Sequence, residues 1–352
     1  MTDKIYKTYR QLLNVLRSRG MEIKKGSQGS RVMRVLEKEN YYNVINGYKD
    51  LFLLSKATAT TEEVYRPNTS FDEIYALYTF DREVRHIYLK YLLKIENMFK
   101  TVIAHEFSAK YGHDNYLKLE NFHSTASTDA KQLAYTAKKL GLTLPQDLAK
   151  VQQKSAEENA AGVIKLIGDI QQEIARQISK NNDVVIHYTT TYGYIPLWVL
   201  VNVLTFGKIT YFYQYMKPAE KNAVAKKFDL QPIELHKYME ILGLARNKCA
   251  HDERFFNIRF RRSLHTRSIK NFSKLGLERK SDGSYQSGTN DAYAVAIIFA
   301  QLLSKAELKE FISSMKDAIG KLERQLYTID IEDVLNNMGY GKTWSKLMEL
   351  KR

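Results

Sequence analysis

The chain has 352 residues, of which 44% are hydrophobic and 12% aromatic, so it is long enough to bury a substantial core. Its one cysteine excludes an internal disulfide framework and favours a reducing compartment, so we expect a cytoplasmic protein. The longest apolar runs, near residues 195–206 and 292–303, are too short to cross a bilayer. Because the chain also starts with polar and charged residues, we expect neither a signal peptide nor a membrane partner.

The charge of the chain is concentrated in two segments. There are 54 Lys and Arg residues against 39 Asp and Glu residues, which gives a formal net charge of +15. Residues 1–40 hold ten basic and four acidic residues, and residues 246–280 hold eleven basic and three acidic residues. A charge that served only solubility would be spread along the chain, so this pattern favours a polyanion such as nucleic acid. A solvated basic surface or loop is the alternative.

The pattern of apolar residues predicts an all-α protein built as a multi-helix bundle, and the chain has only five prolines. We expect an N-terminal helical, basic region at residues 1–60, followed by a Ser- and Thr-rich linker at 55–70. The larger helical domain, at 71–352, carries an insertion around 112–190 and a basic segment at 254–280. The predicted helices are 3–19, 31–39, 41–54, 71–111 as one helix or two, 132–149, 155–180, 198–216, about 233–256, 292–303 and 307–326.

A polar motif stands near the end of the helix predicted at 233–256. Because successive helical residues advance by about 100°, one apolar stripe is predicted to contain Tyr238, Ile241, Leu242, Ala245, Cys249 and Phe256. Asn247, His251 and Arg254 fall on roughly the opposite stripe, which must meet water, a partner or a substrate. Arg246 lies about 140° from His251 by the same step. Only its long side chain or a distorted helix would let these two groups converge.

Arg246 and His251 are residue types suited to the cleavage of RNA, whose 2′-hydroxyl is a built-in nucleophile. Histidine titrates in the range needed to accept that proton or to protonate the 5′-oxygen. A guanidinium matches phosphate oxygens and stays charged, and Asn247 is placed to hold the imidazole or a phosphate oxygen. No metal-ligand cluster with convincing spacing is found. The alternative is a structural cap or a surface cluster, and Cys249 is expected in the core rather than as a nucleophile.

The sequence Arg-Asn-Lys-Cys-Ala-His at residues 246–251 resembles the Arg-Asn-x-x-x-His signature of HEPN ribonucleases. Extended to residue 257, it is similar to bacterial abortive-infection (Abi) proteins of the AbiD/AbiF type. Three other stretches agree with these proteins in the same order, at residues 40–52, at 80–85 and at 196–200 with 205–207. Together with the motif, these landmarks span most of the chain, roughly residues 20–260.

The resemblance implies a HEPN-like helical core and a metal-independent endoribonuclease of antiphage defence, which leaves 2′,3′-cyclic phosphate and 5′-hydroxyl ends. It implies that Arg246, Asn247 and His251 are catalytic, with Arg254 as a phosphate ligand or a salt-bridge partner. An earlier helix of such folds often adds an acidic or polar residue to the cleft, for which Glu96 is the candidate.

Two residues close to Glu96 leave alternatives open. Glu96 and Lys100, four residues apart, most simply form an ion pair on the helix surface. Lys100 to His105 repeats the spacing of Arg246 to His251, which makes His105 a weaker candidate for a second catalytic histidine.

The resemblance also implies partners. HEPN motifs usually act in facing pairs and this chain holds one, so we expect a homodimer. We further expect a bound small structured non-coding RNA and no cofactor. The RNA contacts are placed in the two basic segments, at Lys24, Lys25, Arg31, Arg259, Arg261 and Arg262. The alternative is a non-catalytic RNA-binding or scaffold protein in which the motif serves RNA contact or dimerisation; DNA-binding regulation is weaker, because no helix-turn-helix is evident.

Overall fold

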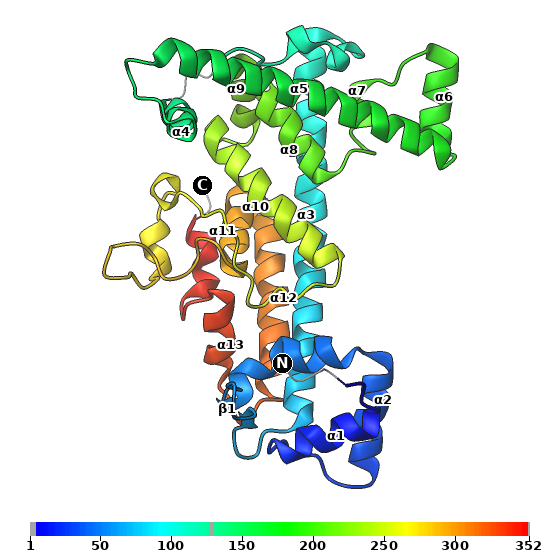
Figure 1. Cartoon of the computed structure of the whole chain (residues 1–352), viewed down its shortest axis with the longest axis vertical. Helices are drawn as coiled ribbons and strands as arrows, with labels where there is room; N and C mark the ends of the chain where they lie inside the picture. The colour runs from blue at the N-terminus through cyan, green and yellow to red at the C-terminus, as the bar shows by residue number, and fades with distance from the viewer. Residues whose placement is uncertain (1–4, 127–129, 351–352) are drawn as a thin grey trace. The chain divides into compact units, whose positions relative to one another are not determined.

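The computed structural model describes residues 5–126 and 130–350 (Figure 1). The start of the helix predicted at 3–19 and three residues, 127–129, of the insertion predicted around 112–190 lie outside these residues. The described chain is almost entirely helical, which confirms the all-α, multi-helix prediction. No helix in the described ranges is long and apolar enough to span a membrane.

The chain forms two compact units. The first consists of residues 1–91 and 244–352, and the second of residues 92–243. Two helices, α3 (Phe71–Tyr111) and α10 (Pro232–Ala250), contribute to both units. These boundaries differ from the predicted division into 1–60 and 71–352.

The first unit begins with α1, whose start is set by a capping box. The Thr8 side chain accepts from the Gln11 backbone and the Gln11 side chain accepts from the Thr8 backbone, so the helix begins at Tyr9 rather than at residue 3. Helix α2 begins at Ser27, after Gly26 in a positive-φ conformation, and not at residue 31 as predicted. The elements of the first unit besides α3 and α10 are α1 (Tyr9–Ser18), α2 (Ser27–Lys38), a π-helix (Tyr42–Asn46), a 3₁₀ turn (Lys49–Phe52), β1 (Leu53–Ser55), β2 (Val64–Tyr65), 3₁₀ turns at Thr266–Ser268 and Phe272–Leu275, α11 (Ala292–Leu302), α12 (Lys305–Glu323), α13 (Ile331–Met338) and a 3₁₀ segment (Trp344–Leu350).

The predicted linker at 55–70 carries structure of its own. Strands β1 and β2 pair antiparallel, with Leu53 opposite Tyr65. The Tyr65 N–H donates to the Arg19 carbonyl at 2.8 Å, and the Glu22 N–H donates to the Thr69 carbonyl at 2.8 Å. These backbone bonds join the first helices to the chain just before α3.

The core of the first unit surrounds α11, whose residues from Ala292 to Ala300 are all buried. Helix α12 runs alongside the N-terminal part of α3 (Figure 1), where the ring centroids of Tyr88 and Phe311 lie 5.2 Å apart. Tyr88 also contacts Phe299 at 5.5 Å and Phe255 at 4.9 Å. Phe255 stands shortly after the motif, so the aromatic core anchors the chain that leaves α10. Truncation of such a buried ring typically costs about 3–5 kcal/mol.

The second unit contains the insertion predicted around 112–190. Its elements besides α3 and α10 are 3₁₀ turns at Asn115–Leu117 and Leu119–Asn121, α4 (Ala130–Leu140), α5 (Leu148–Ser179), α6 (Asp183–Tyr192), α7 (Leu197–Leu200), α8 (Phe206–Tyr215) and α9 (Pro218–Lys227). The single helix predicted at 198–216 is wrong, because the Thr205 side chain caps a new helix by accepting from the Lys208 N–H at 3.3 Å. Rings of Phe107, Phe122 and Phe212 form the core of this unit, with centroids 4.9–5.3 Å apart.

Candidate functional site

The helix that carries the motif ends earlier than predicted. Helix α10 stops at Ala250, and Asp252 adopts a left-handed conformation with φ of 55°. The Glu253 N–H donates to the Lys248 carbonyl at 3.1 Å and the His251 N–H to the Asn247 carbonyl at 3.0 Å. A left-handed residue followed by a bond spanning five residues is the Schellman pattern of helix ends. The prediction of a helix to residue 256 is therefore wrong at its C-terminal end.

This early end changes how the motif residues are presented. Arg246 and Asn247 lie in the last turns of α10, half-buried and exposed respectively. His251 is exposed at the first position after the helix, and Arg254 stands beyond the turn. Asn247, His251 and Arg254 therefore do not form a helical stripe. The predicted apolar residues from Tyr238 to Phe256 are all buried, although Phe256 follows the helix instead of belonging to it.

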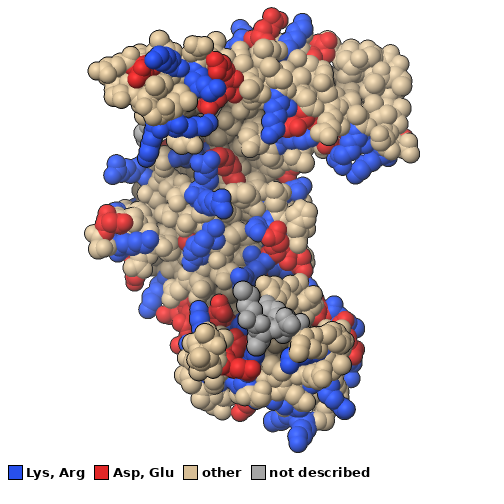
Figure 2. All heavy atoms as spheres, in the orientation of Figure 1, with Lys and Arg blue, Asp and Glu red and all other residues tan. Residues whose placement is uncertain are grey.

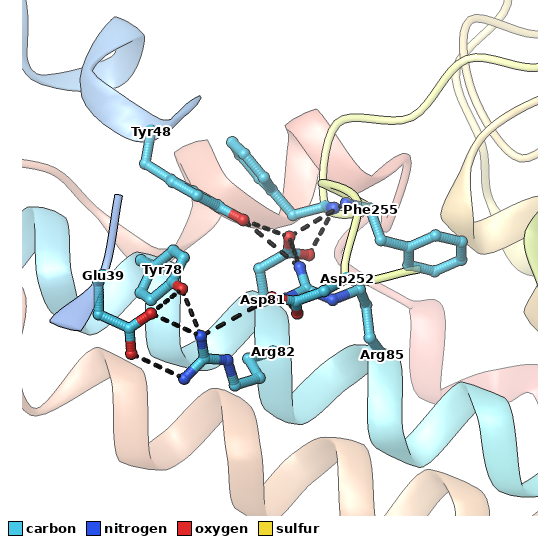
Figure 3. A network of polar contacts seen from close by, with 9 residues as sticks. Glu39, Tyr48, Tyr78, Asp81, Arg82, Arg85, Asp252 and Phe255 are labelled. Atoms are coloured by element: carbon cyan, nitrogen blue, oxygen red, sulfur yellow. Dashed lines mark hydrogen bonds and ion pairs between the residues drawn. The ribbon is translucent and has the colours of Figure 1, made fainter. Parts of the chain in front are cut away.

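A buried carboxylate on α3 holds the chain that follows the motif. Asp81 has no exposed side-chain surface, and it accepts four hydrogen bonds (Figure 3). The donors are the Tyr48 hydroxyl at 2.6 Å, Arg85 Nη1 at 2.6 Å and the backbone N–H groups of Phe255 at 3.0 Å and Phe256 at 2.7 Å. Burial raises the pKa of the Asp81 carboxyl, whereas the Arg85 cation and the other three donors act to lower it. A buried carboxylate is tolerated here because each oxygen has partners.

Arg85 connects this buried carboxylate to the motif turn. Its guanidinium is 1% exposed; Nη1 bonds Asp81, and Nη2 pairs with the carboxylate of Asp252, the residue after His251. Arg82, one position along α3 from Asp81, pairs with both oxygens of Glu39 at 3.1 and 3.0 Å, and its Nη2 lies 3.8 Å from Asp252 Oδ2. The turn beside His251 is thus fixed to α3 by two arginines (Figure 3).

Gly47 and Tyr48 of the N-terminal region also contact the chain that follows the motif. Arg254 donates from Nη1 to the Gly47 carbonyl, and the ring of Phe256 stacks on that of Tyr48 with centroids 5.3 Å apart. Tyr48 is 3% exposed and belongs to the core, whereas Tyr42 is 67% exposed. The contact of Arg254 is with a backbone carbonyl, and its role as a phosphate ligand stays a prediction.

Cys249 belongs to the core, as predicted. It is 5% exposed, and burial raises the pKa of its thiol well above the ordinary range. A thiol kept protonated in this way is a poor nucleophile.

Glu96, the acidic residue predicted to support the cleft from an earlier helix, belongs to the second unit. Glu96 Oε1 pairs with Lys100 Nζ at 2.9 Å, as the spacing predicted, but both side chains are buried and not on the helix surface. His105 is exposed, and its Nδ1 lies 3.4 Å from Glu106 Oε1. Supporting and catalytic roles for these residues stay predictions.

The candidate RNA contacts are all exposed. They are Lys24, Lys25, Arg31, Arg259, Arg261 and Arg262. Arg31 pairs with Asp72, and Arg259 Nη1 donates to the carbonyls of Ile258 at 2.8 Å and Asn337 at 3.0 Å. On the face in Figure 2, basic side chains are interspersed with acidic ones.

Sequence reasoning did not assign a role to four of the residues that hold the motif, namely Tyr48, Asp81, Arg85 and Asp252. A signal for two of them was present. Asp81 and Arg85 stand four residues apart on the same helix face as the apolar Val84 and Tyr88. An opposite-charge pair on an apolar stripe indicates a buried ion pair, because a single buried charge would be too costly.

The fold and the site define an all-α protein whose Arg-Asn-x-x-x-His segment is fixed by a buried acid–arginine network. Residues 34–257 match the family model described as Abi-like protein, and the chain belongs to this family. The match contains the motif and every residue of the network, but not residues 1–33 or 258–352, which belong to the first unit. Neither the curated proteins nor the solved structures gave a match. Family membership supports abortive infection, a form of antiviral defence, as the setting in which the protein acts.

Proposed function

We propose that the protein is a metal-independent endoribonuclease of the HEPN type that acts in abortive infection. Arg246, Asn247 and His251 are its catalytic residues, and its products carry 2′,3′-cyclic phosphate and 5′-hydroxyl ends. The proposal rests on the family match together with one observation. The turn after the motif is fixed to α3 by Arg85 and Asp252, while the imidazole of His251 is left exposed.

This arrangement suits acid–base chemistry at a phosphate. An exposed imidazole at a helix end can reach a 2′-hydroxyl, whereas one packed in the core would be closed to RNA. Arg246, on the last turns of the same helix, supplies a cation for the charge that develops on the phosphorane oxygens. A fixed turn matters because small errors in the position of a catalytic group are costly in rate. Asn247 orients the imidazole or a phosphate oxygen.

The active form in this proposal is a homodimer bound to a small structured non-coding RNA. One chain carries one full motif, so a second copy completes the pair of histidines that take the acid and base roles. The basic residues near Lys24 and Arg261 extend the contact with the polyanion. Among the described residues no group of three or more His, Cys, Asp or Glu side chains is placed to hold a metal ion.

The test is cleavage of labelled RNA in EDTA by purified wild type, Arg246→Ala and His251→Ala, with any co-purified RNA sequenced. His187→Ala, which removes an exposed histidine from α6 of the second unit, is the matched control. We expect cleavage by the wild type and by the control, and a loss of at least about a hundredfold in the two motif variants.

Two other outcomes are informative. Cleavage that survives His251→Ala would contradict the proposal. Intact substrate together with one tightly bound RNA species would favour the alternative, a non-catalytic RNA-binding or scaffold protein in which the motif serves RNA contact or dimerisation.

A further inference from the structure

A second candidate site lies in the basic segment, outside the part of the chain that matches the family. It is a cavity of about 710 Å³ formed by residues 263–289 of the first unit. Small-molecule sites typically occupy roughly 300–1,000 Å³, so the cavity is large enough for a nucleotide. The lining side chains that matter here are Arg267, Arg279, Asp282, Phe272, Tyr285 and Ser284.

One wall of the cavity is a short hairpin. The Lys280 N–H donates to the Ser284 carbonyl at 2.7 Å, and the Gln286 N–H donates to the Glu278 carbonyl at 2.9 Å. Gly283 has φ of 79°, a conformation that glycine adopts without strain, and it allows the tight turn between these bonds. The segment appears in yellow in Figure 1, next to α11.

The hairpin holds an arginine against an aromatic ring. The Arg279 guanidinium lies 4.3 Å from the centroid of the Tyr285 ring, and its Nη2 donates to the Tyr285 hydroxyl at 2.8 Å. Its Nη1 donates to the Gly283 carbonyl at 3.0 Å, and the Tyr285 ring contacts Phe272 at 4.8 Å. The guanidinium plane is therefore held in place before any ligand arrives. A held guanidinium plane can accept a stacked base, and an arginine fork can bind phosphate oxygens.

The cavity also presents an acceptor for hydroxyl groups. Asp282 accepts from the Ser284 N–H at 2.8 Å and from its hydroxyl at 2.6 Å, and these bonds lower the pKa of the carboxyl. An ionised carboxylate accepts hydrogen bonds from sugar hydroxyls and repels phosphate. Cations for a phosphate, a flat surface for a base and a carboxylate for ribose hydroxyls thus line one cavity.

We propose that this cavity binds a nucleoside phosphate, which arrives either as a free nucleotide or as one residue of an RNA strand. Inorganic phosphate would use the arginines alone, and an acidic peptide would leave the stacked arginine and the carboxylate without a role. The inference does not rest on cleavage at His251, because it concerns binding by a different segment of the chain.

The test uses the full chain with His251→Ala, so that RNA probes stay intact. Calorimetry measures the binding of 5′-AMP, 5′-UMP, adenosine and inorganic phosphate, and fluorescence anisotropy measures the binding of labelled oligoadenylate and oligouridylate. Arg267→Ala and Arg279→Ala alter the cavity. Lys270→Ala and Lys280→Ala remove the same charge from exposed neighbours that do not line it. Arg279 also holds the hairpin, so Arg267→Ala is the primary variant.

We expect the cavity variants to weaken binding by at least about tenfold, with little change in the lysine controls. If the arginine variants weaken the binding of 5′-AMP or 5′-UMP, the ligand is a free nucleotide. If they weaken only the binding of the oligonucleotides, the ligand is a residue of an RNA strand. The inference is overturned if inorganic phosphate binds as tightly as the nucleotides, if nothing binds, or if the arginine and lysine variants behave alike. None of these outcomes bears on the cleavage assay, which measures strand scission that depends on Arg246 and His251 and not binding at residues 263–289.

Discussion

Arg85 and Asp252 form an ion pair between α3 and the turn that ends α10. Arg85 is 1% exposed and Asp252 is 58% exposed, so the pair connects the buried Asp81 to the surface at which His251 stands. Because Asp252 follows His251 directly, the orientation of the motif turn depends on a residue buried in another helix.

The first prediction concerns the loss of Arg85. Arg85→Ala leaves the fully buried carboxylate of Asp81 without its cation, and we expect a loss of about 3–5 kcal/mol in the free energy of unfolding. Urea denaturation followed by circular dichroism measures this change. Arg82→Ala is the matched control, because Arg82 is 34% exposed and its removal should cost about 1 kcal/mol or less. Equal losses in the two variants would contradict a special role for the buried pair.

The second prediction concerns the hydroxyl of Tyr48. Tyr48→Phe removes one of the four donors to Asp81 while the stacked ring is kept, and a hydrogen bond to a charged group is worth about 1.5–3 kcal/mol. The same denaturation experiment on Tyr42→Phe, an exposed ring of the preceding π-helix, should show almost no change. A neutral result for Tyr48→Phe would mean that the hydroxyl does not support the network.

These contacts mark the limit of what the sequence could predict. Helical periodicity and scarce prolines were enough to predict the all-α class, and the burial of Cys249 followed from the apolar stripe it shares with Ile241 and Ala245. The end of α10 was beyond reach, because Ala250 to Phe256 has no Gly or Pro to mark a stop. Asp252 takes the left-handed position that glycine usually fills.

The sequence was sufficient to name the residues of the candidate site but not to predict the contacts that hold them in place. The motif from Arg246 to His251 could be found because its residues are neighbours in sequence. Tyr48, Asp81 and Arg85 support the motif through contacts between residues that are far apart in the sequence. Arg85 and Asp252, for example, are separated by more than 160 positions. Periodicity within one helix carries no information about such pairs.

The third prediction separates the two roles of Asp252. Asp252→Gly removes the carboxylate and also the Cβ, which suits the positive φ, whereas Asp252→Ala removes the carboxylate but keeps a Cβ in the left-handed conformation, at a cost of about 1 kcal/mol relative to glycine. We expect urea denaturation to give a higher free energy of unfolding for the glycine variant than for the alanine variant. If the carboxylate positions His251 for cleavage, both variants should lower kcat for RNA by about tenfold or more with RNA affinity unchanged. A fall in affinity with unchanged kcat would contradict this positioning role.

The fourth prediction concerns how the stability contributed by Glu39 changes with pH. The Arg82 guanidinium lowers the pKa of the Glu39 carboxyl, burial opposes this, and the Tyr78 hydroxyl acts with Arg82. Because the pKa is lower in the folded state than in the unfolded state, the interaction contributes stability at neutral pH, and this stability is lost as the pH falls through the folded-state pKa. Glu39→Gln should therefore be less stable than the wild type at pH 7, by about 1 kcal/mol or less, and the gap should close on acidification.

Thermal unfolding of Glu39→Gln and the wild type between neutral and acid pH measures this gap. Glu37→Gln, at an exposed position of α2 two residues before Glu39, is the control and should follow the wild type. A deficit of Glu39→Gln that grows as the pH falls would contradict the sign of the predicted effect.

The most direct test of the central claim asks which atom attacks the phosphate. An RNA cut by the wild type in EDTA is mapped at its ends, and the same RNA is then made with a single 2′-deoxynucleotide on the 5′ side of the mapped bond. If Arg246 and His251 activate the 2′-hydroxyl, the first RNA yields 2′,3′-cyclic phosphate ends and the deoxy-substituted RNA stays intact at that bond. Cleavage of the deoxy-substituted bond, or products with 3′-hydroxyl ends, would contradict the account.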